Sequence, residues 1–447
     1  MTTTGVVLAA GKGARMQSKT PKALHKVAGV SLVGHCVRIM RNAGLDEIIV
    51  VASNEFIDSQ EFTNALFADT QVAIQEEQLG TANALSVVRS KVSMAENLVV
   101  APVDMILVTD SDVRRMVNRH RDTKAVVTLL GSRVDDPTGL GRVRLGASGQ
   151  PIDVLEEHEA DTELLSNNLV NTSWYCFDSH WIWDALDPIS PAETGELYLP
   201  KVVESAANVD RSQIVVAENP ESGIGINDRV QLAIVEKITR NRTNQTHMTN
   251  GVTLQDPENT YIDIDVQIGP DTEIRAGAHI GTRTSIGSDV IIGPNTQIYD
   301  SQIGNFAEIN GARIIESVIG EGVSIGPNSL IRDGSNLMLG SKIGNQAEIK
   351  NSIVGAGSQI SHFSYVGDAT LGENVNIGAG TVTCNYDGND KHLTVIEDDV
   401  SVGSGTMLIA PITVGKAART GAGSVVRTDV AAGDIVAGVP AKSIKSK

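Results

Sequence analysis

The chain of 447 residues is poor in the features that mark several classes of protein. Its three cysteines, Cys36, Cys176 and Cys384, are too few and too scattered to form a disulfide framework or a metal-binding spacing. No apolar run approaches the roughly 18 residues that a transmembrane helix needs. The N-terminal segment shows neither a basic region nor a cleavage site, which argues against a signal peptide. We therefore expect a cytoplasmic protein with reduced thiols and no membrane partner.

Positive charge is also in short supply. The sequence has 36 Lys and Arg against 54 Asp and Glu, which gives a formal net charge of −18. This balance disfavours a nucleic-acid partner, because neutralising a phosphate backbone needs a basic surface. It does not exclude small phosphorylated ligands, since these need only a few well-placed cations and backbone amides.

Glycine, in contrast, is abundant and unevenly spread. Of the 43 glycines, 16 lie in residues 1–260 and 27 in residues 261–447. Such a step indicates two architectures joined end to end. We predict an α/β domain over residues 1–227, a linker helix over 228–250 and a second, glycine-rich domain over 251–447.

The first part of the chain alternates between strand and helix patterns. An apolar strand over 5–10 leads into the loop Gly11–Met16, and a helical pattern follows over 30–43. Further elements are a strand at 47–52, a helix near 57–67 and strands at 72–75, 97–101 and 125–130. This order predicts a Rossmann-like fold with a mainly parallel sheet and helices on both faces. Ligands of such sheets bind beyond the carboxyl ends of the strands, where we expect Gly11, Gln75, Asp104 and Gly141 to converge.

The glycine-rich loop is a candidate phosphate site. Glycines allow backbone amides to approach an anion, and Arg15 and Lys22 lie close by in sequence. The loop has neither the P-loop nor the dinucleotide-binding spacing. Taken alone, it is equally consistent with a plain turn between a strand and a helix.

Several segments together resemble the sugar-1-phosphate nucleotidyltransferases. These are residues 8–16, 21–22, 75–82, 136–142 and 225–229, in the order found in that family. The resemblance implies that a group of residues binds the nucleotide and the sugar phosphate, namely Leu8, Gly11, Gln75, Gly80, Thr81, Gly141, Glu156, Asn171 and Asn227. It also implies that Asp104 and Asn227 hold Mg²⁺.

The chemistry of nucleotidyl transfer suits these residue types. The attacking sugar phosphate is already an anion, so catalysis needs charge neutralisation and in-line positioning rather than a protein nucleophile. Arg15 and Lys22 supply positive charge. Oxygen ligands such as those of Asp104 and Asn227 are the kind that Mg²⁺ prefers.

Beyond Gly251 the sequence repeats every six residues. Aliphatic residues recur from Ile268 to Ile298 in steps of six, and the pattern continues with a few shifts of phase to Val426. This period predicts a parallel β-helix of about nine coils, with three hexads in each coil. Bulky aromatic residues do not fit so narrow a core, which explains why they are only 3% of the chain. The pattern resembles the left-handed hexapeptide-repeat acyltransferases, and only the resemblance implies the left hand.

A polar insertion at 384–394 interrupts the repeat, and loops that interrupt a regular fold are often functional. Upstream lies His362, whose residue type suits a general base that takes a proton from an amino sugar. Glu348 is a candidate to orient it. Arg332 and Lys350 lie three hexads apart, which predicts neighbouring positions at one edge. The competing interpretation is a purely structural prism.

Residues 251–257, 261–263, 362–368 and 374–388 resemble the bifunctional N-acetylglucosamine-1-phosphate uridylyltransferase/glucosamine-1-phosphate acetyltransferase family. The resemblance implies His362 as the base, Glu348 as its orienter and Asn385 as an assisting residue. It places the sugar phosphate on Arg332, Lys350, Tyr365, Asn376 and Lys391. It places acetyl-CoA on Ala379, Tyr386, Ser404 and Ala422. The implied substrates are UTP, N-acetylglucosamine 1-phosphate, glucosamine 1-phosphate and acetyl-CoA, and the implied assembly is a homotrimer.

The chain departs from the family pattern at a few positions. The magnesium aspartate follows Pro102-Val103 rather than a glycine, Ser173 and Lys201 replace a glycine and an aspartate, and Gly438 replaces an arginine. Other interpretations therefore stay open. One is an acetyltransferase with a degenerate first domain, and another is a nucleotidyltransferase for a different sugar 1-phosphate with a structural β-helix. A trimeric scaffold without activity is a further alternative.

Overall fold

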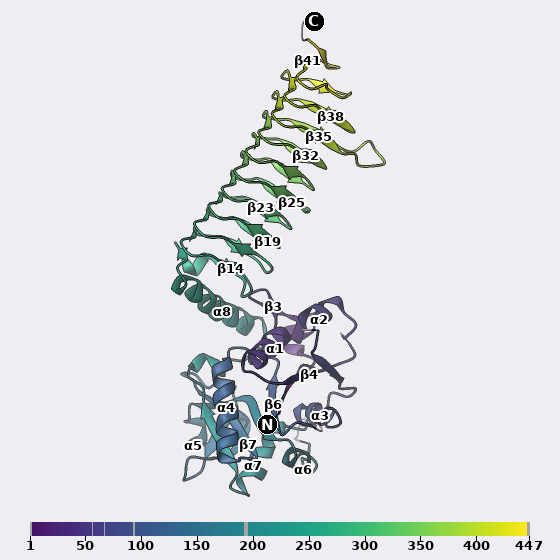
Figure 1. The fold of residues 1–447 in the computed structure, drawn as a ribbon. Coiled ribbons are helices and arrows are strands. Elements are labelled where there is room, and N and C mark those ends of the chain that lie inside the picture. Colours follow the sequence, from purple (N-terminus) through teal and green to yellow (C-terminus); the bar gives the residue numbers. More distant parts are fainter. Residues whose placement is uncertain (1, 56, 67, 93, 192–194, 445–447) are drawn as a thin grey trace. The chain divides into compact units, whose positions relative to one another are not determined.

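The computed structural model describes residues 2–55, 57–66, 68–92, 94–191 and 195–444. The chain divides into two compact units, residues 1–239 and 240–447. Each unit has hydrophobic core clusters of its own. Figure 1 shows helices around the sheet of the first unit and stacked coils in the second. The division falls inside the helix α8 (Arg229–Thr249). No helix in the described ranges is both long and apolar enough to cross a membrane.

The first unit is built on one sheet with the strand order β11-β7-β10-β6-β1-β4-β5. The strands β1, β4, β5 and β6 run parallel, β11 runs parallel to β7, and β10 runs antiparallel to both of its neighbours. The strands are β1 (Thr3–Leu8), β4 (Glu47–Ala52), β5 (Gln71–Ile74), β6 (Asn97–Pro102), β7 (Val127–Arg133), β10 (Leu169–Asp178) and β11 (Ser212–Val216). A hairpin of β8 (Arg142–Leu145) and β9 (Pro151–Leu155) joins β10. The expected mainly parallel sheet is confirmed.

Both faces of this sheet are covered by helices. Along β1, Val6 and Val7 belong to different core clusters, because successive side chains of a strand point to opposite faces. One face packs α1 (Leu32–Asn42) and α4 (Asp110–Thr123). The other packs α3 (Thr81–Ser86), α6 (Trp181–Leu186) and α7 (Val202–Ala207). The short helices α2 (Gln60–Ala65) and α5 (Thr162–Leu165) complete the unit.

Helix starts follow local capping chemistry. The Ser31 hydroxyl accepts a hydrogen bond from the Gly34 amide at 3.1 Å, which satisfies a free N–H at the start of α1. At α4, Thr109 and Asp112 form a reciprocal capping box. The cap at Ser31 places α1 close to the helical pattern predicted over 30–43, whereas α4 was not predicted.

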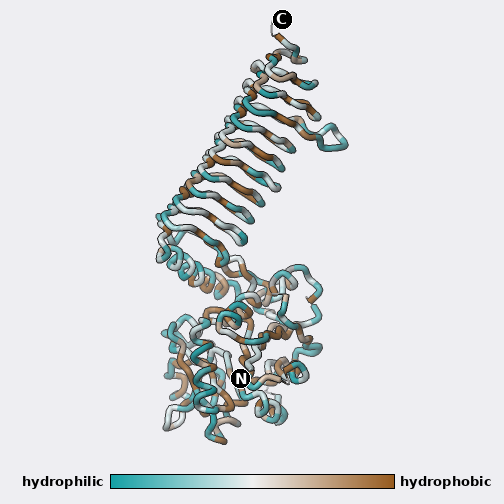
Figure 2. The backbone as a smooth tube through the Cα atoms, in the orientation of Figure 1, coloured by the Kyte–Doolittle hydropathy of each residue, from teal (hydrophilic) through white to brown (hydrophobic). Residues whose placement is uncertain are grey.

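The second unit is a parallel β-helix. Its short strands from β12 (Thr253–Leu254) to β37 (Met407–Ile409) each pair with the strand three elements later. At the C-terminal end β39 (Arg419–Thr420) pairs with β41 (Ile435–Ala437), and β41 pairs antiparallel with β42 (Lys442–Ser443), which makes three sheets of 12, 10 and 9 strands. Apolar residues therefore recur once per face of each coil (Figure 2). Most of the predicted interior residues are buried, including Ile292, Ile331 and Ile377, which are fully buried, whereas Ile268 is only partly buried. Thr383 fills one interior position as well.

The glycine that follows many of the interior aliphatic residues is required by the packing of the coils. A Cβ added at Gly304 would lie 2.7 Å from the Glu321 backbone nitrogen of the next coil. Close stacking of the coils therefore excludes a side chain there. The corner itself is turned two residues later, by a residue with positive φ such as Phe306 or Gly380.

Candidate functional site

Nine of the predicted residues of the first unit line one cavity of about 620 Å³. The cavity opens where β1, β5 and β6 end, as expected for a parallel sheet. Those nine residues are Leu8, Gly11, Arg15, Lys22, Gln75, Gly80, Thr81, Asp104 and Asn227. Lys12, Gln78 and Glu196 also line it and were not predicted.

The glycine-rich loop is packed tightly against Lys22. Gly13 has a φ of 59°, and a Cβ added there would lie 2.6 Å from Lys22 Cβ. Both the backbone conformation and the close contact therefore require glycine. The loop then enters a short 3-10 helix over Ala14–Met16, which carries Arg15.

Two oxygen atoms converge on the Lys22 ammonium. Lys22 Nζ lies 2.5 Å from Asp104 Oδ2 and 3.3 Å from Asn227 Oδ1. Arg15 Nη2 donates to the same Asn227 oxygen at 2.9 Å. Asp104 and Asn227 thus already share one cation, and their donor types fit Mg²⁺. The described residues contain no group of three or more His, Cys, Asp or Glu that would hold a metal alone, so substrate oxygens would have to complete the coordination of an ion here.

The side chain of Gln75 is fixed at the opposite wall. It is 4% exposed, and its Nε2 donates to Asn83 Oδ1 at 2.7 Å and to the Gly80 carbonyl at 3.3 Å. Gly80 has a φ of 111° and lies so close to the backbone of Leu197 that no side chain fits. This wall is therefore a rigid surface of backbone and amide groups, suited to a planar base.

Gly141, Glu156 and Asn171 form a second group beside β8 and β10. The Asn171 amide donates to the Gly141 carbonyl at 2.9 Å, and a Cβ on Gly141 would lie 3.5 Å from Glu156 Oε1. Asn171 Nδ2 donates to the Tyr175 hydroxyl at 2.7 Å. Burial, and then the nearby Glu159, raise the pKa of Glu156. In the described chain the three predicted sugar residues thus lie together, but they are not among the residues that line the 620 Å³ cavity.

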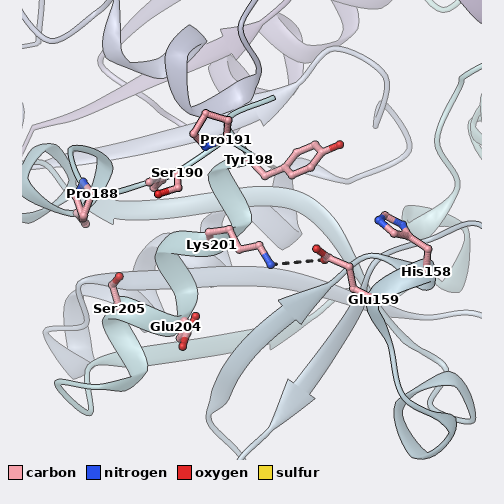
Figure 3. A pocket seen from close by; sticks show the side chains of 11 residues that line it. His158, Glu159, Pro188, Ser190, Pro191, Tyr198, Lys201, Glu204 and Ser205 are labelled. Carbon is pink, nitrogen blue, oxygen red and sulfur yellow. Dashed lines mark ion pairs between the residues drawn. The ribbon is translucent and has the colours of Figure 1, made fainter. Parts of the chain in front are cut away.

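A larger cavity of about 890 Å³ in the same unit was not predicted. Figure 3 shows Lys201 pointing toward Glu159, and their charged atoms are 3.5 Å apart. The lining combines this pair with His158, Glu204 and several prolines. None of the predicted site residues is among the described residues that line it.

In the second unit, the predicted base and coenzyme residues stack at one corner. The Gly380 amide donates to the His362 carbonyl, the Gly405 amide to the Ala379 carbonyl and the Gly423 amide to the Ser404 carbonyl, at 2.7 to 2.9 Å. Successive coils therefore place His362, Ala379, Ser404 and Ala422 in one column. His362 is exposed, and its Nδ1 accepts a hydrogen bond from the Asn345 amide at 3.3 Å.

A cluster of cations lies on the neighbouring sheet. Arg332 in β25 (Leu330–Arg332) is in register with Lys350 in β28 (Glu348–Lys350), as the spacing predicted. Lys350 and Lys391 line a cavity of about 600 Å³ together with Asp333 and Asp368. The other residues that line it are Asn351, His392 and Leu393.

Carboxylates hold these cations in place. Arg332 contacts Glu348 through Nε at 2.9 Å and Nη2 at 2.7 Å. Lys350 Nζ lies 3.6 Å from Asp368 Oδ2. Burial opposes the ionisation of Asp368, but hydrogen bonds from Asn351 and from Asn385 lower its pKa.

The arrangement differs from the predicted one at Glu348. The contacts of this carboxylate in the described structure are with Arg332, and no contact links it to His362. Glu348 belongs to a strand of the sheet, whereas His362 occupies a corner before Tyr365, which is in register with Glu348. Its role as the orienter of the base stays a prediction.

The remaining predicted residues lie on different faces. Asn385 is 8% exposed, and its Nδ2 contacts Asp368 and lies 3.5 Å from the Tyr365 hydroxyl. Tyr386 is exposed in the inserted loop. Asn376 lies in β33 (Asn376–Ile377), in a different sheet from Lys350. A single copy of the chain therefore does not gather all the predicted acetyl-transfer residues.

Sequence reasoning missed Asp368 as a site residue. A signal was present, because the hexad phase slips between Val366 and Leu371. Asp368 sits in this irregular corner with a φ of 49°, a conformation that Asp tolerates better than most residues. His392 was missed as well, although it follows Lys391 directly.

The departures from the family pattern have structural counterparts. Val103 is 6% exposed and packs into the core, although it also lines the first cavity. Ser173 has a φ of 58°, in the left-handed region that glycine prefers. Gly438 has a φ of 98°, which disfavours any side chain at that position.

The comparisons with known proteins cover both units. Residues 5–166 match the MobA-like NTP transferase domain, residues 265–300 the bacterial transferase hexapeptide and residues 287–376 the GlmU-like C-terminal hexapeptide.

Relatives named Bifunctional protein GlmU match almost end to end. The relative from Syntrophomonas wolfei is 39% identical over 432 residues, which cover 96% of each chain. The relative from Exiguobacterium sibiricum is 40% identical, and the match covers 95% of each chain. The relative from Heliobacterium modesticaldum is also 40% identical, and the match covers 96% of this chain and 94% of the relative. With this identity over nearly the whole length, the chain belongs to the GlmU family of bifunctional proteins.

Proposed function

We propose that the chain is a bifunctional enzyme of UDP-N-acetylglucosamine synthesis. The second unit transfers the acetyl group of acetyl-CoA to glucosamine 1-phosphate. The first unit then transfers the uridylyl group of UTP to N-acetylglucosamine 1-phosphate and releases pyrophosphate. The observation that carries this proposal is that one chain of a bifunctional family holds both a cation-lined cavity at the strand ends and a second cation cluster on the β-helix.

In the first unit, the residues act by positioning and charge neutralisation. The glycine-rich loop and Arg15 meet the triphosphate, while the Gln75 wall holds the base. Lys22 neutralises charge at the reacting phosphate, where a phosphate oxygen of the sugar attacks and pyrophosphate leaves. Mg²⁺ bound by Asp104 and Asn227 would supply further charge neutralisation there. Gly141, Glu156 and Asn171 hold the sugar.

In the second unit, His362 acts as a neutral base. The amine nitrogen of the sugar attacks the thioester carbon, and the imidazole takes the proton of the amine. The C–S bond then breaks, and the imidazolium passes this proton to the departing thiolate, so that coenzyme A leaves as the thiol. Ala379, Ser404 and Ala422 lie in the same column as His362, which supports a coenzyme site within reach of the base. The cation cluster around Lys350 binds the sugar phosphate.

The active assembly is a homotrimer. Its support is the distribution of the predicted residues, because Asn376 and Lys350 lie on different sheets of one copy. A neighbouring copy that approaches an edge of the β-helix would bring both into one site. Exposed apolar side chains such as Leu339 and Phe363, which are 60% and 64% exposed, are available for such contacts. Light scattering on the pure protein measures the mass of the assembly, and a monomer would contradict it.

Two separate assays test the proposed activities. Thiol release from acetyl-CoA with glucosamine 1-phosphate tests the second unit, and pyrophosphate release from UTP with N-acetylglucosamine 1-phosphate tests the first. The variant His362→Ala should abolish only thiol release, and Asp104→Ala should abolish only pyrophosphate release. Each variant is therefore the control for the other.

The pattern of activity separates the alternatives. Absence of thiol release from the wild-type protein would refute the proposal. Absence of pyrophosphate release alone would favour an acetyltransferase with a degenerate first unit, and a panel of nucleoside triphosphates and sugar phosphates would then identify any other specificity.

A further inference from the structure

The inserted loop is a closed hairpin between β34 (Val382–Cys384) and β35 (Thr394–Ile396). Tyr386 and Lys391 form an antiparallel bridge across it. The His392 amide donates to the Asn385 carbonyl at 2.7 Å, which closes the base of the hairpin. The loop is therefore an ordered structure rather than an irregular excursion of the chain.

Both oxygens of the Asp387 carboxylate are engaged inside this hairpin. Asp387 Oδ1 accepts hydrogen bonds from the amides of Asn389 and Asp390, each at 2.8 Å, which fixes the turn. Asp387 Oδ2 lies 2.7 Å from His392 Nε2. The hydrogen bond to His392, followed by those from the two amides, strongly lowers the pKa of Asp387. One carboxylate thus ties the tip of the hairpin to its base.

The hairpin carries Lys391 toward a like charge. Lys391 and Lys350 line the same cavity. A hydrogen-bond interaction with Lys350, and then the charge of Lys350, lower the pKa of Lys391. The charge of Lys350 repels the Lys391 side chain, so Lys391 stays in place only if its backbone is held. The adjacent residue His392 can hold it, because its side chain contacts Asp387.

We propose that Asp387 and His392 are positioning residues for acetyl transfer. Their pair fixes the hairpin so that Lys391 and Lys350 together meet the phosphate of the amino sugar. The same closure holds Asn385 against Asp368 at the base of the loop. This inference rests on the proposed acetyltransferase function.

The kinetic test compares four variants of the full-length protein. His392→Ala and Asp387→Asn weaken the pair, His392→Gln keeps a donor at the position of Nε2, and Asp390→Asn is a control in the same loop. Ordering a lysine side chain at a binding site costs a free energy that corresponds to about a fivefold to tenfold change in affinity. We expect KM for glucosamine 1-phosphate to rise by about that factor in His392→Ala and Asp387→Asn. KM for acetyl-CoA should stay near its wild-type value, and both parameters should be near wild type in His392→Gln and Asp390→Asn.

Hydrogen exchange tests the hairpin without reference to catalysis. The amides of Asn389 and Asp390 should exchange faster in His392→Ala than in the wild-type protein, and His392→Gln should restore their protection. Unchanged exchange in His392→Ala would show that the pair does not hold the loop, which overturns the inference.

The outcomes also separate this inference from the proposed function. An active wild-type enzyme whose KM for glucosamine 1-phosphate is unchanged in His392→Ala overturns the inference alone. Equal loss of affinity for both substrates, with a lowered melting temperature, would assign the pair to folding and overturns it too. A wild-type protein without thiol release refutes the proposed function itself.

Discussion

The histidine His120 should make the first unit lose stability in acid. Its side chain is 2% exposed, at the end of α4, and its Nδ1 bonds to Thr128 Oγ1 at 3.0 Å. Burial lowers the pKa of His120 from 6.5 to about 4, although Asp178 acts in the opposite direction. The folded protein therefore keeps this ring neutral over a pH range in which the unfolded chain takes up a proton.

The sign and the size of this change in the free energy of unfolding follow from proton linkage. Above pH 6.5 neither state protonates His120, so its contribution is constant. Below that value the unfolded state binds a proton first, and stability falls until the folded ring titrates near pH 4. A pKa lowered from 6.5 to about 4 corresponds to a loss of about 3 kcal/mol in the free energy of unfolding.

Tryptophan fluorescence makes the measurement specific to this unit, because all three tryptophans lie between residues 174 and 183. Urea unfolding of the full-length protein is compared between pH 7 and pH 4 for the wild type, for His120→Asn and for His180→Asn. His180, whose side chain is 84% exposed, is the matched control. The wild type and His180→Asn should lose about 3 kcal/mol more than His120→Asn over this range. Parallel pH profiles for all three proteins would refute the reasoning.

Three further perturbations test other parts of the structure. Because burial raises the pKa of Cys384, iodoacetamide at pH 8 should modify this thiol more slowly than an unperturbed peptide cysteine, as mass spectrometry would report. In the β-helix, Gly304→Ala should lower the free energy of unfolding by about 3 kcal/mol, because the new side chain overpacks against the next coil. Gly322→Ala meets open space at a φ of 63° and should lower it by only about 1 kcal/mol. Circular-dichroism melting compares the two variants, and equal losses of stability would contradict the stacking argument. Replacing the left-handed Ser173 in Ser173→Gly should stabilise the first unit by about 1 kcal/mol, a rise of about 3 °C in its melting temperature measured by tryptophan fluorescence.

The β-helix could be predicted closely because its signal is repetitive. One aliphatic residue per hexad has to fill a narrow interior. The spacing of these residues along the chain therefore predicts the period, the phase shifts and the buried positions. The pairing of Arg332 with Lys350 followed from the same arithmetic. What the period did not reveal was why glycine follows many of these aliphatic residues, since the approach of the next coil is a three-dimensional constraint.

The cavity of the first unit was predicted for a different reason. In a parallel sheet the residues that follow the strands share one edge, so Gly11, Gln75 and Asp104 converge whatever lies between them. Gly141, which was expected to join them, is not among the described residues that line this cavity. The contact between Glu348 and Arg332 was not predicted. Whether Glu348 contacts His362 or Arg332 depends on the side of the strand on which each of these two residues lies. Side-chain contacts of this kind are decided by the register of the coils and have no pattern in the sequence.

Cations of both proposed phosphate sites are paired with carboxylates, in a chain of net charge −18. Lys22 is paired with Asp104, Arg332 with Glu348 and Lys350 with Asp368. At each of these cations a phosphate would therefore replace a carboxylate as the anionic partner. The net gain in binding free energy would depend on the geometry of the contacts more than on their charge.

Lys391 differs from these cations because a hydrogen-bond interaction with Lys350 lowers its pKa. A phosphate between the two ammonium groups would remove a repulsion rather than replace an attraction. An anion between Lys391 and Lys350 would therefore gain more free energy than an anion at the paired cations. It would also need a more accurate placement of the Lys391 side chain. If the sugar phosphate binds here as proposed, the conformation of the loop beside Lys391 should affect its binding more than the strength of the paired cations around it.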